Sequence, residues 1–340
     1  MTNDSTANPT VILDLLIAFR RSKAMFAAVS LGVFDALEHG PKTAAALAGE
    51  IKANADALGQ LLDACVGMGL LQLGPSGYAN TAAASAFLCR HSSRRLTGYL
   101  IYSNDVLWKL WEHLEDAVRE GTHRWQQTYG WDGPIFANFF RTDEAKREFL
   151  QGMHGYGLIS SPQVVASFDL SRFRRLVDLG GATGHLTVAA CERYPSLHGV
   201  VFDLPDAVPL AREMVAASPV ADRVTVQAGD FFTDPLPEAD LFAVGRILHD
   251  WSEDKIRILL RKVHERLPAG GALLVAEKLI QDDRSGPIWA QMQSLNMLVC
   301  TEGKERTLAE YEALLKEAGF AEVQGRPTPS PLDAVLAIKR

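Results

Sequence analysis

The sequence has few cysteines, and they are not grouped. Its 340 residues include 4 cysteines, and Cys65, Cys89, Cys191 and Cys300 lie far apart without a CxxC pair or a nearby histidine at zinc spacing. Disulfide frameworks and structural metal sites need such grouping. We therefore expect neither, and we expect reduced thiols in a cytoplasmic protein.

Long apolar runs and an excess of positive charge are also missing. No stretch reaches the roughly 18 apolar residues of a membrane span, and the start, MTNDSTANPTVILDLL, lacks the basic residues of a signal peptide. Lys and Arg number 34 against 41 Asp and Glu, a net charge of −7. Such a chain gains no general attraction to nucleic acids or anionic membranes. We expect neither as a partner.

The composition is that of a globular protein. Its first part, residues 1–95, has the pattern of a winged-helix domain. Apolar positions in residues 11–32 and 58–71 recur at helical spacing, and residues 71–78, LQLGPSGY, predict a short hairpin. A winged helix binds DNA or serves dimerisation. The presumed recognition helix at 55–65, ADALGQLLDAC, has no Lys or Arg for phosphates or bases. We therefore favour dimerisation or packing.

Residues 96–170 are expected to be helical and rich in aromatic side chains. Most of these should be core, but a few are placed to line a pocket for a flat substrate. We predict a helical linker that lines the substrate site. The aromatic residues are Trp108, Trp111, Trp125, Trp131, Phe139 and Phe140.

From residue 171 to 340, apolar runs of strand length alternate with helical stretches. This rhythm is typical of a mostly parallel, doubly wound sheet. The fold class expected is therefore α/β, a Rossmann-like domain after an N-terminal all-helical winged-helix domain. The predicted strands are 176–179, 200–203, 224–227, 241–244 and 272–276, with 333–339 as a final edge strand.

The first of these strands ends in a glycine turn, VDLGGATG. Glycines at such a turn let the backbone approach a ligand closely. The dinucleotide pattern GxGxxG fails, since Ala182 and His185 stand at its third and sixth positions. Asp178, just before the turn, would repel a phosphate and suits a cationic ligand. A nicotinamide reductase is thus disfavoured. The glycines of the turn are Gly180, Gly181 and Gly184.

Acidic residues also follow the next two strands. Asp203 lies about twenty residues beyond the turn, where a carboxylate can bind ribose hydroxyls. Asp230 is placed to bind an exocyclic amine, with Phe231 against a purine. Each aspartate alone is an ordinary loop residue, but successive parallel strands end at one crevice. The pocket suits a nucleoside with positive charge and no phosphate, such as S-adenosylmethionine.

The fourth strand leads into AVGRILHDWS, which contains His249. A phenol has a pKa near 10 and a histidine one near 6.5, so a histidine can take the phenolic proton during methyl transfer. A carboxylate that orients the ring would help. Glu277 and Glu305 are candidates. Asp250 is a weaker one, because neighbours along a strand point to opposite faces unless the strand has ended.

These motifs resemble those of the plant-type small-molecule O-methyltransferases, which are class I and depend on S-adenosylmethionine. Within that family they are most similar to the acetylserotonin (hydroxyindole) O-methyltransferases and their methyltransferase-like relatives. The matching blocks are LVDLGGATG, VVFDLPD, AGDFFTDPLPEADL, RILHDW and QSLNMLVCTEGKERT. The resemblance runs from about residue 11 to the end. It implies a homodimer built by the N-terminal domain, with no metal.

The resemblance also implies roles for single residues. His249 would be the general base, flanked by Glu277 and Glu305. The implied cofactor contacts are Asp178, Gly180, Gly181, Gly184, Asp203, Leu204, Gly229, Asp230, Phe231, Phe232 and Arg246. The implied lining of the pocket for the small-molecule methyl acceptor is Trp108, Met153, Trp251, Met292, Asn296, Met297 and Cys300.

The sequence departs from the family pattern at several positions. Ala182 stands where many relatives have a third glycine, which is a mild change if its φ is negative. Trp108 and Cys300 replace a tyrosine and a glutamine of the hydroxyindole enzymes, so the acceptor need not be acetylserotonin. Arg20 and Arg21 replace apolar residues; they form a solvated helix face or reach the partner's pocket to hold an anionic acceptor.

The leading prediction is O-methylation of a small aromatic hydroxyl with His249 as base. The runner-up is an S-methyltransferase that acts on a small thiol or thioether acid and needs no base. A third reading is a cofactor-binding protein without activity.

Overall fold

The computed structural model describes residues 8–131, 133, 136–137 and 142–340. The chain divides into two compact units, Met1–Asp105 and Val106–Arg340, which are described separately. A separate linker segment over 96–170 stays a prediction. Phe139 and Phe140, named above as aromatic candidates, lie outside the described residues.

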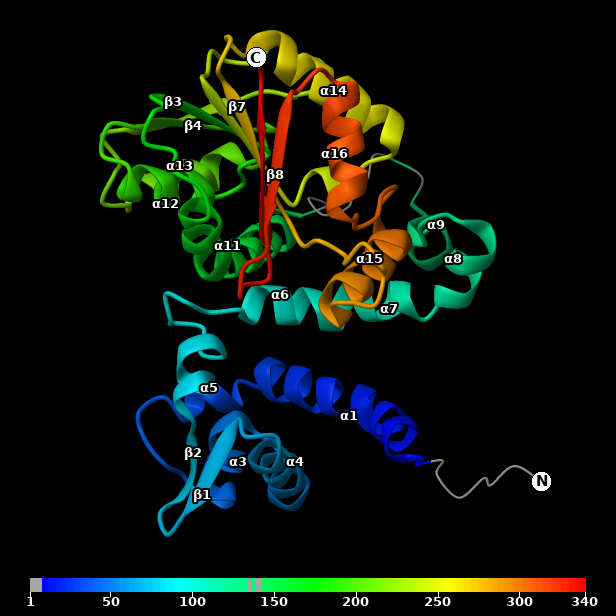
Figure 1. Ribbon diagram of the computed structural model, residues 1–340. Helices are drawn as coiled ribbons and strands as arrows, with labels where there is room; N and C mark the ends of the chain where they lie inside the picture. The colour runs from blue at the N-terminus through cyan, green and yellow to red at the C-terminus, as the bar shows by residue number, and fades with distance from the viewer. Residues whose placement is uncertain (1–7, 132, 134–135, 138–141) are drawn as a thin grey trace, which may run out of the picture. The chain divides into compact units, whose positions relative to one another are not determined.

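The N-terminal unit is helical apart from one hairpin, which lies where the winged-helix pattern predicted it (Figure 1). Thr43 accepts a hydrogen bond from the Ala46 N–H at 3.2 Å and so caps α3, while Asn54 caps α4 in the same way. The elements are α1 (Thr10–Ser30), α2 (Val33–Ala36), α3 (Ala44–Ile51), α4 (Ala55–Gly67), β1 (Leu71–Gly74), β2 (Gly77–Asn80), α5 (Ala82–Phe87) and α6 (Thr97–Tyr102).

Helix α1 presents an apolar surface that its own unit does not bury. Only Ala28 and Val29 of this helix are buried. Arg20 and Arg21 are exposed on it as well. An apolar helix surface of this kind is typical of an interaction site. Its exposed apolar side chains, 41% to 66% exposed, are Val11, Ile12, Leu13, Leu15, Leu16, Ile17 and Phe19.

The C-terminal unit is built on a seven-stranded sheet in the order β5-β4-β3-β6-β7-β9-β8. The first five strands in this order are parallel, and β9 is antiparallel to both of its neighbours. The predicted Rossmann-like architecture is confirmed. The strands are β3 (Arg175–Leu179), β4 (His198–Asp203), β5 (Val224–Ala228), β6 (Leu241–Gly245), β7 (Ala272–Glu277), β8 (Glu322–Arg326) and β9 (Asp333–Ile338).

The last strand is not at the edge, contrary to the sequence prediction. β9 lies between β7 and β8, and β8 forms the edge. Sequence reasoning missed β8 because its five residues, EVQGR, are mostly polar, include a glycine and are only partly buried. Its backbone pairing with β9 holds it in the sheet.

Helices cover both faces of this sheet (Figure 1). α12 (His185–Arg193), α13 (Val208–Ala216) and the end of α11 (Asp143–Ala166) pack on one face, and α14 (Glu253–Arg266) and α16 (Leu308–Glu317) pack on the other. Other helices in the described residues are the π-helix η1 (Ser103–Leu107), α7 (Trp108–Trp111), α8 (Leu114–Glu120), α9 (Trp125–Tyr129), the 3-10 turn η2 (Leu248–Asp250) and α15 (Ile288–Cys300). Across the described part of the chain, none of the helices combines the length and apolar character that crossing a membrane requires.

Candidate active site

The carboxyl ends of β3, β4 and β5 carry the three predicted acidic residues. These strands are neighbours and parallel, so their ends lie at one edge of the sheet. Asp178 lies inside β3, Asp203 is the last residue of β4, and Asp230 follows β5 by two residues. The structure therefore brings the three acids to one edge of the sheet.

The glycine turn lies against this edge. Gly180 has a φ of 67°, a conformation that favours glycine, and a Cβ there would be 2.3 Å from Ile247 Cδ1 and 3.5 Å from Phe231 Cε1. Ala182 has a φ of 49°. The expectation of a mild change held only for a negative φ, and it is wrong: the alanine occupies the left-handed region, where a Cβ is strained.

Asp203 is tied to this turn by both carboxylate oxygens. Oδ2 accepts from the Ala182 N–H and Oδ1 from the Leu204 N–H, each at 2.7 Å. A carboxylate has about four acceptor positions, so two remain for ribose hydroxyls. Burial raises the pKa of Asp203 to about 6.

Asp178 is more deeply enclosed than the sequence suggested. It is 2% exposed and accepts a hydrogen bond from the Thr187 hydroxyl at 2.9 Å. Burial raises its pKa to about 7. A Cβ on Gly181 would lie 2.9 Å from its carboxylate, and one on Gly184 would lie 2.8 Å from Val201. Asp178 therefore shapes the turn from behind, and a nearby cation would favour its ionised form.

An aromatic group follows β5. Asp230 accepts from the Phe232 N–H at 2.8 Å, which turns the chain so that the Phe231 and Phe232 rings pack edge to face with centroids 4.7 Å apart. Trp251 packs perpendicular to Phe232 at 5.0 Å. Gly229 has no room for a side chain, because a Cβ would lie 2.3 Å from the Phe202 ring.

These residues fit S-adenosylmethionine. The carboxylates suit its positive charges and ribose, the glycines permit close approach, and Phe231 offers a flat apolar contact. This combination suits a charged nucleoside without phosphates. The phosphates of a dinucleotide would instead be repelled by the negative charge of the carboxylates.

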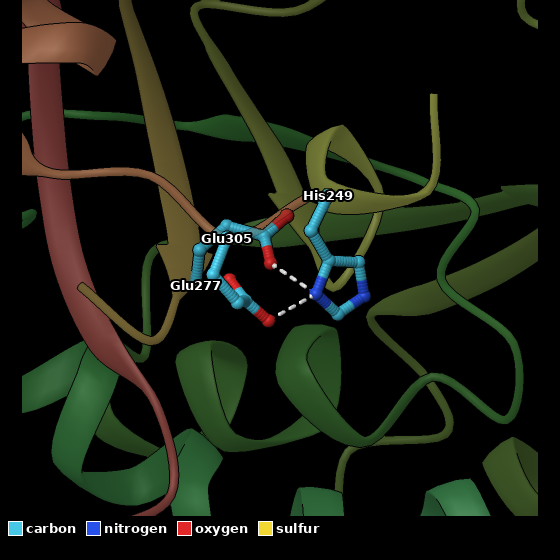
Figure 2. A group of neighbouring side chains, drawn as sticks. All are labelled: His249, Glu277 and Glu305. Carbon is cyan, nitrogen blue, oxygen red and sulfur yellow. Dashed lines mark hydrogen bonds and ion pairs between the residues drawn. The ribbon is translucent and has the colours of Figure 1, made fainter. Parts of the chain in front are cut away.

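His249 lies in η2, the turn that follows β6, and is 3% exposed. Its Nδ1 is 2.6 Å from Glu305 Oε1 and 3.3 Å from Glu277 Oε2. Figure 2 shows both carboxylates at the same ring nitrogen. The predicted grouping of these three residues is thus present, and Nε2 is left on the other side of the ring.

The two glutamates differ in their other contacts. Glu277 ends β7, and its Oε1 accepts from the N–H groups of Ile247 and Leu248, each at 2.9 Å. Glu305 lies in the segment before α16, with its backbone N–H donating to Ser294. Burial raises the pKa of both carboxyl groups, that of Glu305 to about 8. Proximity to a histidine that gains a proton would favour their ionised forms.

Asp250 is closer to His249 than the sequence argument allowed. Strand β6 ends at Gly245, so residues 248–250 form a turn and do not alternate between faces. His249 Nε2 is 3.6 Å from Asp250 Oδ1. Burial raises the pKa of this aspartate to about 7. Asp250 therefore lies beside the ring nitrogen that would meet a substrate.

The same three side chains have the composition of a metal site. Ligand atoms of His249, Glu277 and Glu305 all lie within 4.8 Å of one another. The 2.6 Å from Nδ1 to Glu305, however, is the length of a charge-assisted hydrogen bond. Two atoms that bind one zinc ion, each at about 2.0–2.2 Å, lie farther apart. The geometry favours a base with its carboxylates.

Helix α15 carries most of the predicted acceptor contacts. Asn296 Oδ1 accepts from Trp111 Nε1 at 2.9 Å, and the Cys300 thiol donates to the Asn296 carbonyl at 2.7 Å. Trp125 Nε1 donates to the Cys300 carbonyl at 2.8 Å. Both tryptophans were among the aromatic candidates, but their hydrogen bonds to α15 were not predicted. Of the other predicted lining residues, Met297 is buried, Met292 is exposed, and Trp108, Met153 and Trp251 are half-buried.

Helix α11 adds polar residues that sequence reasoning missed. His154 contacts the Thr183 hydroxyl of the glycine turn at 2.8 Å, and His185 contacts Ser161 at the same distance. A Cβ on Gly157 would lie 2.1 Å from His185 Cγ, so this glycine makes room for the ring. A small cavity opens here, lined by Gly157, Ser160, Ser161, Val164, His185, Leu186, Gly245, Arg246, Ala276 and Leu332.

Family models match both units. The model described as the O-methyltransferase domain covers residues 111–321, and that of the O-methyltransferase dimerisation domain covers residues 13–90. The chain belongs to the O-methyltransferase family. The dimerisation match agrees with the winged-helix prediction for the N-terminal unit.

Relatives within the O-methyltransferase family support this. Acetylserotonin O-methyltransferase of Bos taurus is 40% identical over 94% of this chain and 95% of its own length. A probable bifunctional dTTP/UTP pyrophosphatase/methyltransferase protein of Homo sapiens is 41% identical over 97% of this chain, which spans 54% of that protein. The crystal structure of human N-acetylserotonin methyltransferase in complex with SAM superposes with a TM-score of 0.93 and 37% identity, covering 99% of each chain.

The structure called PigF with SAH matches with a TM-score of 0.88 and 27% identity over 98% of this chain and 100% of that one.

The present protein is an S-adenosylmethionine-dependent O-methyltransferase. No finding supports the sulfur-acceptor alternative.

Proposed function

We propose that the chain methylates the hydroxyl group of a small aromatic molecule, with His249 as general base. The contact of 2.6 Å between His249 Nδ1 and Glu305 Oε1 is the main support. When Glu305 is ionised its carboxylate accepts but does not donate, so this contact then places the ring proton on Nδ1 and leaves the Nε2 lone pair to accept a proton. A histidine held in this way suits proton removal from a hydroxyl.

Each residue of the base group then has a defined part. S-Adenosylmethionine supplies an electrophilic methyl group when bound. His249 Nε2 would accept the phenolic proton as the oxygen uses the freed electron pair to bond the methyl carbon. The electron pair of the methyl–sulfur bond would stay on sulfur, so that S-adenosylhomocysteine is the leaving group. Glu305 and Glu277 stabilise the resulting imidazolium, because two buried carboxylates face Nδ1. The proton then passes from Nε2 to solvent.

The residues proposed to hold the cofactor are those at the ends of β3 to β6. Asp203 has two acceptor positions left for ribose, Gly180 permits close approach, and Phe231 lies directly beside that glycine. Asp230 would bind the adenine amine. Arg246 has a φ of 58° and lines the cavity beside the glycine turn. The guanidinium of Arg246 would bind the carboxylate of the methionine part of S-adenosylmethionine.

For the acceptor we propose a small, mainly apolar hydroxyaromatic. The side-chain oxygen of Asn296 accepts a hydrogen bond from Trp111, and the Cys300 thiol donates one to the backbone carbonyl of Asn296. Burial raises the pKa of that thiol, so it stays protonated. This side of the site thus has few free acceptors. Relatives are named acetylserotonin O-methyltransferases, so hydroxyindoles are one class to test.

We also propose a homodimer formed through α1. Its exposed apolar side chains, with Leu15 at 66%, lie in the matched dimerisation domain. Leu15→Glu combined with Leu16→Glu should give a monomer in light scattering. Val118→Glu, a change at an equally exposed position at 62% in the other unit, should leave the dimer intact.

The experiment that tests the function is release of S-adenosylhomocysteine from a panel of phenols, catechols, hydroxyindoles, thiols and thioethers. We expect turnover of one or more aromatic hydroxyls, and His249→Ala should lower kcat about 10²- to 10⁴-fold. His264→Ala is the control, because this histidine lies in α14 and packs against the ring of Phe320. Full activity of His249→Ala at neutral pH, or turnover of sulfur compounds alone, would contradict the proposal.

A further inference from the structure

Arg306 is a buried arginine behind the proposed base that none of the roles above uses. It is 1% exposed. Burying a guanidinium is costly unless it has partners. Its place in the active-site region therefore needs an explanation from its contacts.

One nitrogen of Arg306 connects the two segments that carry the base and its carboxylate. Nη1 donates to the Leu248 carbonyl at 3.2 Å and to the Lys304 carbonyl at 3.0 Å. Leu248 directly precedes His249, and Lys304 directly precedes Glu305. The arginine thus bridges the backbone next to each of the two interacting side chains.

The two segments are packed closely enough for such a bridge to control their distance. A Cβ on Gly303 would lie 2.2 Å from the His249 carbonyl oxygen, and the Glu302 N–H donates to the Asp250 carbonyl at 3.1 Å. On the opposite side, Glu277 accepts from the N–H groups that precede His249. The turn that carries His249 is therefore held from two sides. Glu277 accepts hydrogen bonds from its N–H groups, and Arg306 donates one to its Leu248 carbonyl.

We propose that Arg306 is a positioning residue that fixes the turn of His249 against the segment of Glu305 and whose charge favours the ionised carboxylate. This inference rests on the proposed role of His249 as base. Arg306 touches neither substrate nor reacting atoms in this proposal; it acts through the 2.6 Å contact between His249 and Glu305.

The charges around Glu305 give Arg306 its second effect. Burial raises the pKa of Glu305 to about 8, while Arg246 and Arg306 lower it. Arg246 is proposed to serve the cofactor, so Arg306 is the cation left to this carboxylate among the described neighbours. The other ionisable groups that face Glu305 are His249, Asp250, Glu277, Tyr311 and Asp333.

The test is kcat and KM against pH for Arg306→Met and Arg306→Lys. Arg306→Met should lower kcat about 10- to 100-fold. It should also move the acid limb of the profile to higher pH, since Glu305 would ionise later, and leave the KM for S-adenosylmethionine unchanged. Arg306→Lys keeps the charge, but its ammonium is one bond closer to the backbone than Nη1 and should not reach both carbonyls, so kcat should fall with the acid limb near its wild-type position.

Arg223→Met is the matched control. Arg223 Nη1 donates to the carbonyls of Cys191 and Leu197 at 2.8 and 3.0 Å in the same unit, away from His249. It should lower thermal stability without moving the profile. Lower thermal stability with an unmoved pH profile in Arg306→Met would overturn the inference, and so would a wild-type kcat in Arg306→Met. If Arg306→Met fails to bind S-adenosylhomocysteine, unchanged kcat in Arg306→Lys decides against the inference.

Failure of the inference is separable from failure of the proposed function. If His249→Ala keeps full activity, the base role fails and the inference with it. If His249→Ala loses activity while the Arg306 variants keep the wild-type profile, the base role stands and the inference alone is wrong.

Discussion

The carboxylate of Asp203 accepts a hydrogen bond of 2.7 Å from the backbone N–H of Ala182. The same alanine has a φ of 49°, so the bond that orients the acid proposed to bind ribose is made by a strained residue. The backbone keeps the conformation that glycine would adopt freely, and its stability cost can be measured.

Ala182→Gly should stabilise the protein by about 1 kcal/mol, because relief of left-handed strain exceeds the extra entropy of the unfolded glycine. Chemical denaturation is the measurement. Ala189→Gly, within helix α12, is the control and should destabilise by about 1 kcal/mol. Equal losses in both variants would show that Ala182 carries no strain.

Binding of S-adenosylhomocysteine should strengthen as the pH rises from 5 to 7. Burial raises the pKa of Asp203 to about 6, and ribose hydroxyls donate to the ionised form. Below this pKa the acid is protonated and affinity falls; well above it affinity levels off. Burial raises the pKa of Asp178 to about 7, so its ionisation should extend the rise toward neutral pH. Calorimetry at several pH values measures this.

Asp203→Asn should weaken that binding about 10- to 100-fold at pH 8, as expected for lost hydrogen bonds to a charged group, and should flatten its pH dependence. Asp206→Asn is the control, since Asp206 is exposed and pairs with Lys146. Unchanged affinity in Asp203→Asn would remove this residue from the cofactor site.

Glu305→Gln should lower kcat at least about tenfold, because the amide keeps the shape but cannot compensate the imidazolium. In the wild type, kcat should rise with pH toward about 8, the pKa to which burial raises Glu305, as its ionised form builds up. The variant should lose that part of the rise. Glu302→Gln, in the same segment but paired with Lys255 at the surface, should behave as wild type.

Chelators should leave the rate unchanged. The hydrogen-bond length of 2.6 Å between His249 and Glu305 leaves no place for a shared ion. Activity assayed with EDTA, and again after addition of Mg²⁺ or Zn²⁺, is the measurement. Loss of rate with EDTA that returns with one metal would reassign these three residues as ligands.

Much of the fold followed from sequence pattern because four of the five parallel strands, β3, β4, β6 and β7, are mainly buried apolar runs between helices, while β5 is only partly buried. β8 did not, since its pairing with β9 determines it and its polar residues carry no pattern. The grouping of His249, Glu277 and Glu305 was predicted from strand ends and from the family resemblance.

Other parts of the site depend on contacts between distant segments. Trp111 meets Asn296, and His154 meets Thr183, across many residues of chain. Asp250 was underestimated because the end of β6 could not be located to the residue. The φ of Ala182 is likewise set by its surroundings and not by its own preference.

The interior place of β9 links the far end of the chain to the catalytic centre. Asp333, its first residue, binds Lys278 and the N–H of Leu279, just after Glu277. β8 pairs with β9 alone, so loss of β9 would release two strands at once. During synthesis the carboxylate behind His249 would therefore gain its full support only after β9 had left the ribosome.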